Sequence, residues 1–387
     1  MQAAITNRYS DNDTMKTTHK PRIVADSKIP YLRGILEPYA LVSYHAPAEI
    51  DNRVAREADM LIVRTRTHID SHLLQGSPCR FVATATIGYD HIDTAYCAAH
   101  GIRWVNAPGC NASSVGQYVL ASLLAWANAR QRHLPDLTIG IVGAGHVGKV
   151  VEQYCKAIGM RVLLNDPPRA RAEGAEKFVS LATIAAEADI VTFHTPLTAE
   201  GSDATYHLGS AEFFAATQRK PLIINSSRGA VVDNKALLKA LSQGEICDVI
   251  MDCWEGEPQI DAALLAAAFI ATPHIAGYSA DGKSNATRMT VEAVAREMGI
   301  TIETSTIVPP LPTVATIGVE GLADGLSAAV LSSYNPLTET AQLKQHPETF
   351  EAMRNSYGLR REFPAYTVTG AKEEEAAILR RLGFHIA

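Results

Sequence analysis

The stretch Leu137–Lys149, LTIGIVGAGHVGK, decides the fold of this chain. Its first six residues form an apolar, β-rich run of the length typical of a buried parallel strand. Gly143, Gly145 and Gly148 follow in the spacing G-x-G-x-x-G. An apolar stripe at helical intervals comes next, consisting of Val147, Val150, Val151, Tyr154 and Ile158. The stretch therefore predicts a strand, a tight glycine turn and a helix, the unit that binds a dinucleotide.

Each glycine of the turn has a physical role in such a unit. The first permits the tight turn, the second lets backbone N–H groups approach a pyrophosphate, and the third lets the helix pack close to its strand. The same spacing also occurs in purely structural turns. A second strand at Arg161–Leu164, followed by an acid at Asp166, favours the cofactor interpretation.

Asp166 stands 18 positions after Gly148, close to the spacing of about 20 expected for a ribose-binding acid. A carboxylate there accepts hydrogen bonds from both ribose hydroxyls and repels a 2′-phosphate, so we expect NAD rather than NADP. Arg169 complicates this choice unless it is a solvated loop charge. The structural alternative for Asp166 is a turn residue before Pro167.

Length and composition set the class of protein. With 387 residues, 47% of them hydrophobic and 20% charged, the chain suits two or three soluble domains. The net charge of −6 gives no reason to expect nucleic acid or an anionic membrane as partner. The six cysteines show neither a C-x-x-C pair nor zinc spacing, so we expect no metal and a reducing, cytoplasmic location. Residues 1–20 are polar and are expected to be a disordered extension, with Met15 as an alternative start.

The chain alternates short strands and helices before the glycine turn, a rhythm that predicts a first parallel α/β layer. Helices are expected at Ala48–Ala58 and Asp93–His100, and a long helix capped by Asn111 or Ser113 leads toward the turn. The five strands expected in this layer are Arg22–Ala25, Ala40–Ser43, Met60–Val63, Phe81–Ala85 and Arg103–Val105.

The alternation resumes after Asp166 and predicts a six-stranded dinucleotide sheet. Asp233 is expected to cap a helix that Gly244 closes. Beyond about Val291 the pattern changes to helices and a single strand, Ala365–Val368. The four strands expected to complete the sheet are Asp189–Phe193, Pro221–Asn225, Asp248–Met251 and Phe269–Ala271.

Polar residues follow the ends of these later strands, where ligands bind in a doubly wound sheet. Arg228 offers a fork of N–H donors suited to a carboxylate. His274 is able to take a hydroxyl proton, and Glu257 is able to hold its other ring nitrogen and fix the tautomer. Together they predict a hydride-transfer site for a 2-hydroxy acid. Alone, each is equally a loop histidine or a surface charge, and His194 is a rival base.

Five motifs in order make the chain resemble the D-2-hydroxyacid dehydrogenase family. The resemblance covers about Arg22 to Thr287 and rests on GIVGAGHVG, HTPLT, INSSRGAVVDN, DCWEGEP and TPHIAGYS. Within that family the chain most resembles the members that oxidise 4-phospho-D-erythronate in the biosynthesis of pyridoxal phosphate. The segments that carry this closer likeness are VRTRT, TATIGYDHID, APGCNASSV, NDPPR, IAGYSADGK and RNSYGLRREF.

The resemblance implies specific site residues. Arg228, Glu257 and His274 form the catalytic set, and the substrate contacts are Thr65, Thr86 and Tyr278. NAD is held by Gly143, Gly145, His146, Val147, Gly148, Asp166, Thr195, Ser226, Ser227, Arg228, Asp252 and Gly277. Two positions depart from the family pattern: Gln117 replaces a common glutamate, with a role the sequence leaves open, and Thr65 replaces a serine but keeps its hydroxyl.

The resemblance also implies three folded parts. These are a flavodoxin-like substrate (lid) domain over residues 21–112 with about 276–296, a doubly wound Rossmann-type NAD domain over 113–275, and a small α+β domain over 297–387 that forms a homodimer. Arg64 and Lys283 are candidates to bind a substrate phosphate. Arg360 and Arg361 are candidates from a partner subunit, although Arg360 also fits a solvated helix face.

The sequence thus predicts a cytoplasmic, NAD-dependent oxidation of 4-phospho-D-erythronate to 2-oxo-3-hydroxy-4-phosphobutanoate. Two alternatives remain open. One is a dehydrogenase for another D-2-hydroxy acid such as 3-phosphoglycerate, although an obvious regulatory tail is missing. The other is a non-catalytic, NAD-sensing scaffold of the same fold, which the intact Arg228, Glu257 and His274 disfavour.

Overall fold

The computed structural model describes residues 20–387, which form two compact units. One unit consists of residues 20–111 and 280–310, and the other of residues 112–279 and 311–387. The predicted N-terminal extension and the alternative start at Met15 lie outside the described residues. Within residues 20–387, no helix has both the length and the apolar character that a membrane span requires.

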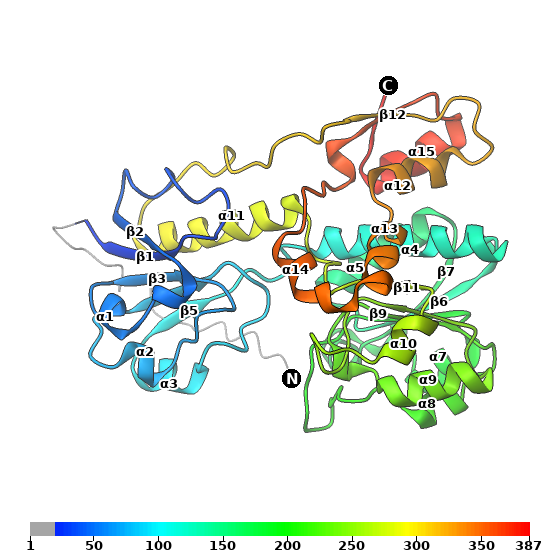
Figure 1. Cartoon of the computed structure of the whole chain (residues 1–387), viewed down its shortest axis with the longest axis horizontal. Coiled ribbons are helices and arrows are strands. Elements are labelled where there is room, and N and C mark those ends of the chain that lie inside the picture. Colours follow the sequence, from blue (N-terminus) through cyan, green and yellow to red (C-terminus); the bar gives the residue numbers. More distant parts are fainter. Residues whose placement is uncertain (1–19) are drawn as a thin grey trace. The chain divides into compact units, whose positions relative to one another are not determined.

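The first unit is a five-stranded parallel sheet in the order β2-β1-β3-β4-β5, the order of flavodoxin-like folds. Helix α11 packs along this sheet and is drawn yellow in Figure 1. The strands are β1 Arg22–Asp26, β2 Leu41–His45, β3 Met60–Val63, β4 Phe81–Thr84 and β5 Arg103–Val105; the helices are α1 Asn52–Ala55, α2 Ser71–Leu74, α3 Thr94–Ala99 and α11 Ala280–Glu297.

The predicted helix over Ala48–Ala58 is wrong in its length. The chain forms a 3-10 turn at Pro47–Glu49 and then only the four-residue helix α1. The Asp51 side chain accepts a hydrogen bond from the backbone N–H of Val54, which starts α1 at Asn52. A cap inside an apolar helical pattern therefore breaks the predicted helix in two.

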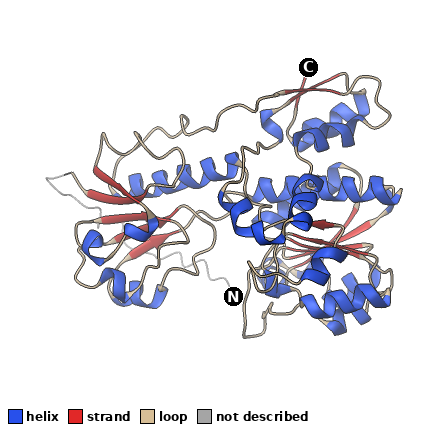
Figure 2. Cartoon of the chain, in the orientation of Figure 1, coloured by secondary structure: helices blue, strands red, loops and turns tan. Residues whose placement is uncertain are grey.

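The second unit contains the predicted six-stranded sheet, all parallel, in the order β11-β10-β9-β8-β6-β7 (red strands in Figure 2). Connections reverse between β6 and β8, and a doubly wound sheet binds ligands at that crevice. The strands are β6 Thr138–Val142, β7 Arg161–Asn165, β8 Ile190–Phe193, β9 Leu222–Asn225, β10 Asp248–Met251 and β11 Ile270–Ala271; the helices are α4 Ala112–Arg130, α5 His146–Ala157, α6 Pro167–Glu173, α7 Leu181–Glu187, α8 Ala211–Ala215, α9 Asn234–Gln243 and α10 Ala262–Ala267.

The local signals read from the sequence explain several of these boundaries. Asp233 accepts hydrogen bonds from the N–H groups of Lys235 and Ala236 at the start of α9, and Gly244 ends it with φ 70°. Helix α4 is buried on almost all sides because it packs between α5 and α12. At its far end, Trp126 and Arg130 donate hydrogen bonds of 2.9 and 2.8 Å to the carboxylate of Asp248 on β10.

Residues 311–387 belong to the same compact unit as the six-stranded sheet. Their parallel strands form a sheet in the order β12-β13-β14, and helix α13 packs on β11, where the Thr340 hydroxyl accepts the N–H of Ala271 at 3.1 Å (Figure 1). The elements are β12 Thr316–Gly318, α12 Gly325–Ser333, α13 Leu337–Gln345, α14 Phe350–Asn355, β13 Thr367–Thr369, α15 Glu373–Leu382 and β14 His385–Ile386. Independent folding of this part, and the predicted domain boundaries, stay predictions.

Candidate active site

The glycine turn has the shape that a pyrophosphate needs. Gly143 has φ 92°, and a Cβ on Gly148 would meet the carbonyl oxygen of Gly143 at 2.1 Å, so α5 approaches β6 only because both are glycine. A Cβ on Gly145 would meet nothing within 4 Å. Gly145 is the N-cap of α5, and no side chain caps this end of the helix, so the first N–H groups of α5 lie at its positive end without a side-chain acceptor.

Asp166 follows β7 and caps α6. Its Oδ1 accepts the N–H of Arg169 at 3.0 Å, and its Oδ2 accepts the N–H of Ala144 at 2.9 Å. Arg169 is bonded to both carboxylate oxygens of Glu173 and to the carbonyl of Ala144. The hydrogen bond to Glu173 raises the pKa of Arg169. Arg169 is therefore not a solvated loop charge, because its guanidinium is paired with the carboxylate of Glu173. With Arg169 neutralised by Glu173, the carboxylate of Asp166 keeps its capacity to accept hydrogen bonds from ribose hydroxyls.

Two hydroxyls of the predicted NAD site are buried and, within residues 20–387, have no hydrogen-bond partner. They are Oγ1 of Thr195, after β8, and Oγ of Ser226, after β9. A buried hydroxyl without a partner is costly, and a polar ligand removes that cost. Neighbouring Ser227 is different, because its Oγ donates to Oδ1 of Asn225 at 2.9 Å and holds the turn. The residues present therefore fit a dinucleotide.

His274 and Glu257 form a close pair. Nδ1 of His274 lies 2.8 Å from Oε2 of Glu257, and Oε1 of Glu257 accepts the N–H of Trp254 at 2.8 Å. An ionised carboxylate only accepts hydrogen bonds, so Nδ1 carries the proton and Nε2 is the basic nitrogen of the neutral ring. Burial alone would raise the pKa of Glu257, but the hydrogen bond and charge of His274, the Trp254 N–H and the charge of Arg354 lower it overall. Glu257 is therefore ionised at neutral pH.

Asp252 holds the loop that carries His274. Its buried carboxylate accepts hydrogen bonds from the Thr272 hydroxyl at 2.7 Å and from the N–H groups of Ile275 and Ala276 at 2.8 and 2.9 Å. Its own carbonyl accepts the N–H of His274 at 2.8 Å. These bonds fix His274 in a left-handed conformation with φ 56°, which a non-glycine residue rarely adopts. The structure thus shows a positioning role for Asp252 beside its predicted NAD contact.

Arg228 follows β9 and is brought against the Glu257 loop by Gly229. A Cβ at position 229 would meet the Trp254 carbonyl oxygen at 1.9 Å, so these two loops touch through backbone atoms. Asn225 donates to the carbonyl of Arg228 at 3.0 Å, and Nη1 of Arg228 donates to the Ser227 carbonyl at 2.8 Å. The strand-end residues Arg228, Glu257 and His274 therefore belong to one connected set of loops.

His194 is a poor rival base. Burial lowers its pKa to about 3, and its Nδ1 is buried with no hydrogen-bond partner among the described residues. Its Nε2 lies 2.9 Å from the Thr192 hydroxyl. The ring therefore remains neutral and weakly basic at any pH near 7.

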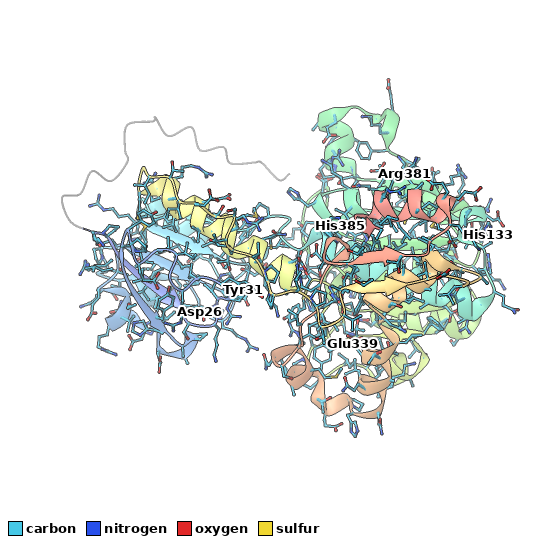
Figure 3. The ribbon with its side chains drawn as sticks, turned by 90° about the horizontal axis from the view of Figure 1, so that it is seen from above. Asp26, Tyr31, His133, Glu339, Arg381 and His385 are labelled. Atoms are coloured by element: carbon cyan, nitrogen blue, oxygen red, sulfur yellow. The ribbon has the colours of Figure 1, made fainter. Side chains whose placement is uncertain are left out.

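The predicted substrate residues Thr65 and Thr86 belong to the first unit. Thr65 is exposed in the turn after β3, and the Thr86 hydroxyl donates to the Gly88 carbonyl at 3.0 Å. Arg64 pairs with the fully buried Asp26 at 2.9 Å, so one of its edges is already used; Figure 3 labels Asp26 in this unit. The role of Thr65, Thr86 and Arg64 stays a prediction.

The comparisons with known proteins agree with this geometry. The chain is 48% identical to the erythronate-4-phosphate dehydrogenase of Bacteroides thetaiotaomicron over 352 residues, which cover 91% of this chain and 100% of that protein. It is 44% identical to the enzyme of the same name from Porphyromonas gingivalis, over 94% of this chain and 99% of that protein. The chain belongs to the erythronate-4-phosphate dehydrogenase family.

Family profiles and a solved structure place this family among the NAD-dependent dehydrogenases. Residues 117–276 match the NAD-binding domain of D-isomer specific 2-hydroxyacid dehydrogenases, and residues 309–383 match a domain of unknown function, DUF3410. A D-lactate dehydrogenase from Aquifex aeolicus, solved with NAD and lactic acid, is 25% identical with a TM-score of 0.59 and covers 72% of this chain and 96% of its own. The predicted fold, the use of NAD and the dehydrogenase class are confirmed.

The structure corrects the expectation for the C-terminal arginines. Arg360 is buried rather than on a solvated face, and its guanidinium donates to the carbonyls of Ile275 and Ala276 and to Ser114. Arg361 is also buried, and its carbonyl accepts the side-chain N–H of Gln117 at 3.0 Å. Gln117 thus ties α4 to this segment. Arg360 therefore stabilises the loop that follows His274 in the same chain.

Proposed function

We propose that this chain oxidises 4-phospho-D-erythronate at C2 to 2-oxo-3-hydroxy-4-phosphobutanoate, in the biosynthesis of pyridoxal phosphate. The observation that carries the proposal is the 2.8 Å pair of His274 and Glu257 on the loops that follow β10 and β11. The names of the relatives supply the substrate, because a strand-end acid–base pair alone fits any 2-hydroxy acid.

Three side chains have distinct roles in this reaction. Arg228 pairs with the substrate carboxylate through its fork of N–H donors. His274 takes the proton of the C2 hydroxyl on Nε2, while Glu257 holds Nδ1 and stabilises the imidazolium that forms. NAD, when bound, accepts the C2 hydrogen as hydride. The C2–H and O–H bonds break, a C=O bond forms, and NADH and protonated His274 are the remaining products.

The same residues act in reverse when the oxo acid is reduced, with His274 donating the proton. The proposed NAD contacts are Gly145, His146, Val147, Asp166, Thr195, Ser226, Ser227, Asp252 and Gly277. The proposed substrate contacts are Thr65, Thr86 and Tyr278. The unpartnered hydroxyls of Thr195 and Ser226 are the structural support for this cofactor set.

The substrate proposal is tested by NADH formation, followed by absorbance, with 4-phospho-D-erythronate, 3-phosphoglycerate and D-lactate at matched concentrations. We expect the highest kcat/KM with the first acid. A higher kcat/KM with either other acid would leave the His274–Glu257 chemistry in place but refute this substrate.

We also propose that the chain is a cytoplasmic homodimer joined through its C-terminal part. Leu311 and Val314 are 74% and 67% exposed, so this segment offers apolar side chains that a partner subunit would bury. All six cysteines are unpaired, as expected in a reducing compartment. Light scattering measures the mass of the protein in solution. A wild type that is dimeric, with a double variant Leu311→Asp and Val314→Asp that is monomeric, would support this interface. A monomeric wild type would refute it.

A further inference from the structure

Arg354 lies beside the candidate active site, although it comes from the C-terminal segment. Its Nη2 is 3.3 Å from the hydroxyl of Tyr278, the predicted substrate residue four positions after His274. Its guanidinium carbon is 5.9 Å from the centre of the Tyr278 ring. Its positive charge also reaches Glu257, the partner of His274, and contributes to lowering the pKa of that carboxyl.

The hydrogen-bonding capacity of Arg354 is only partly used. Nη1 pairs with Glu351 at 3.0 Å, one turn earlier on α14, and Nη2 donates to Tyr278. Nε is buried and has no hydrogen-bond partner among residues 20–387. A guanidinium has five N–H donors, and a buried N–H without an acceptor is costly. The edge that carries Nε can therefore donate to a further acceptor, and an anionic acceptor suits the charge of the guanidinium best.

The segment that carries Arg354 is firmly attached to the loop after His274. The ring of Tyr357 packs edge-on against Tyr278 with centroids 6.1 Å apart, and its hydroxyl donates to Glu339 on α13 at 2.9 Å. Figure 3 labels Glu339 on this orange segment. The Ser279 hydroxyl donates to Glu362 at 2.6 Å. Such contacts hold Arg354 in place, which a binding residue requires.

We propose that Arg354, with the Tyr278 hydroxyl, binds the phosphate group of the substrate. The inference rests on the proposed function, in which Arg228 takes the substrate carboxylate and His274 the C2 hydroxyl. The phosphate on C4, two carbons further along, is then the remaining anion. A guanidinium fork and a phenol hydroxyl are donors suited to phosphate oxygens. The domain of unknown function at residues 309–383 thus contributes to substrate recognition.

The test compares Arg354→Gln with a matched control, Arg380→Gln. Arg380 lies on α15 of the same segment, pairs with Glu373 at 3.7 Å and is 54% exposed, so its loss removes an exposed pair only. For each protein we measure KM for 4-phospho-D-erythronate and the inhibition constant of D-erythronate, which lacks the phosphate, as a competitor. The ratio of the two constants isolates the phosphate contact from effects on the shared part of the molecule.

We expect Arg354→Gln to raise the ratio of KM to inhibition constant by about 10- to 100-fold, the effect of losing a charged hydrogen bond. Arg354→Lys, which keeps a charge, is expected to recover part of this loss, and Arg380→Gln to leave the ratio at the wild-type value. An equal rise of both constants in Arg354→Gln would overturn the phosphate assignment. Failure of the proposed function is seen separately, as wild-type protein that does not turn over 4-phospho-D-erythronate.

Discussion

Replacing Gly229 with alanine tests how closely the Arg228 and Glu257 loops must approach. The added Cβ would lie 1.9 Å from the carbonyl oxygen of Trp254, 2.2 Å from its carbonyl carbon and 2.6 Å from the N–H nitrogen of Glu255. All three are backbone atoms, so no side-chain rotation relieves the clash. Ordinary contact between such atoms begins near 3.4 Å, so the loops must separate by more than 1 Å.

A separation of that size affects stability and catalysis differently. Overpacking of a close contact costs about 1–3 kcal/mol of the free energy of unfolding. Moving Arg228 away from the His274–Glu257 pair by about 1 Å is expected to lower kcat/KM by about 100-fold, because catalysis depends on the geometry of the bound substrate. The larger loss is therefore expected in activity.

The assay combines urea unfolding with steady-state NADH formation for Gly229→Ala and for a control, Gly358→Ala. A Cβ on Gly358 would meet nothing within 4 Å, so the control is expected to behave like wild type in both measurements. Wild-type kcat/KM in a folded Gly229→Ala protein would refute the argument that this contact positions the site.

Three further predictions concern the surroundings of the site. Glu257→Gln keeps a hydrogen-bond acceptor but loses the charge that stabilises protonated His274. Steady-state kinetics should therefore show kcat lowered by about 100-fold or more, with KM for NAD little changed. A wild-type kcat in this variant would count against a role for the charge. His194 has a pKa near 3 when folded and 6.5 as its ordinary value, so the unfolded state binds more protons between these pH values and stability should rise with pH up to 6.5. Urea unfolding of His194→Gln should show a flatter rise over that window, and an unchanged slope would mean that another group causes it. Arg360→Leu leaves the carbonyls of Ile275 and Ala276 without this donor, so urea unfolding should show a loss of about 1–3 kcal/mol or more, whereas wild-type stability would show that the buried guanidinium is dispensable.

The sequence predicts the five- and six-stranded sheets well because their signals are local. In the C-terminal sheet it predicts one strand, and the expectation of a single strand there is wrong, because β12 and β14 have only three and two residues and carry no periodic signal. Buried strands such as Met60–Val63 are continuous apolar runs, and the glycine turn needs residues without a side chain at fixed spacing. The candidate acid–base pair was also predictable, because the carboxyl ends of parallel strands meet at one edge of a sheet.

The parts that the sequence could not predict depend on packing between distant segments. Arg360 reaches carbonyls 84 and 85 positions earlier in the chain, and Arg354 reaches Tyr278 across 76 positions. Neither the hydrophobic periodicity of the sequence nor the spacing of its motifs indicates contacts between such distant segments. From the sequence alone, Arg360 therefore resembled an exposed helix residue. The break of the Ala48–Ala58 helix carried a local signal, Asp51, that the apolar pattern concealed.

The most direct test of the central claim measures oxidation of 4-phospho-D-erythronate by wild type and by His274→Ala. Turnover is followed first as NADH formation and then, with a 2-oxo acid added to reoxidise any retained NADH, as conversion of that oxo acid to its hydroxy acid. We expect turnover by the wild type and a loss of about 100- to 10,000-fold in the variant, the contribution of general acid–base catalysis. Wild-type protein that stays silent even with the 2-oxo acid, or a variant as active as wild type, would contradict the account.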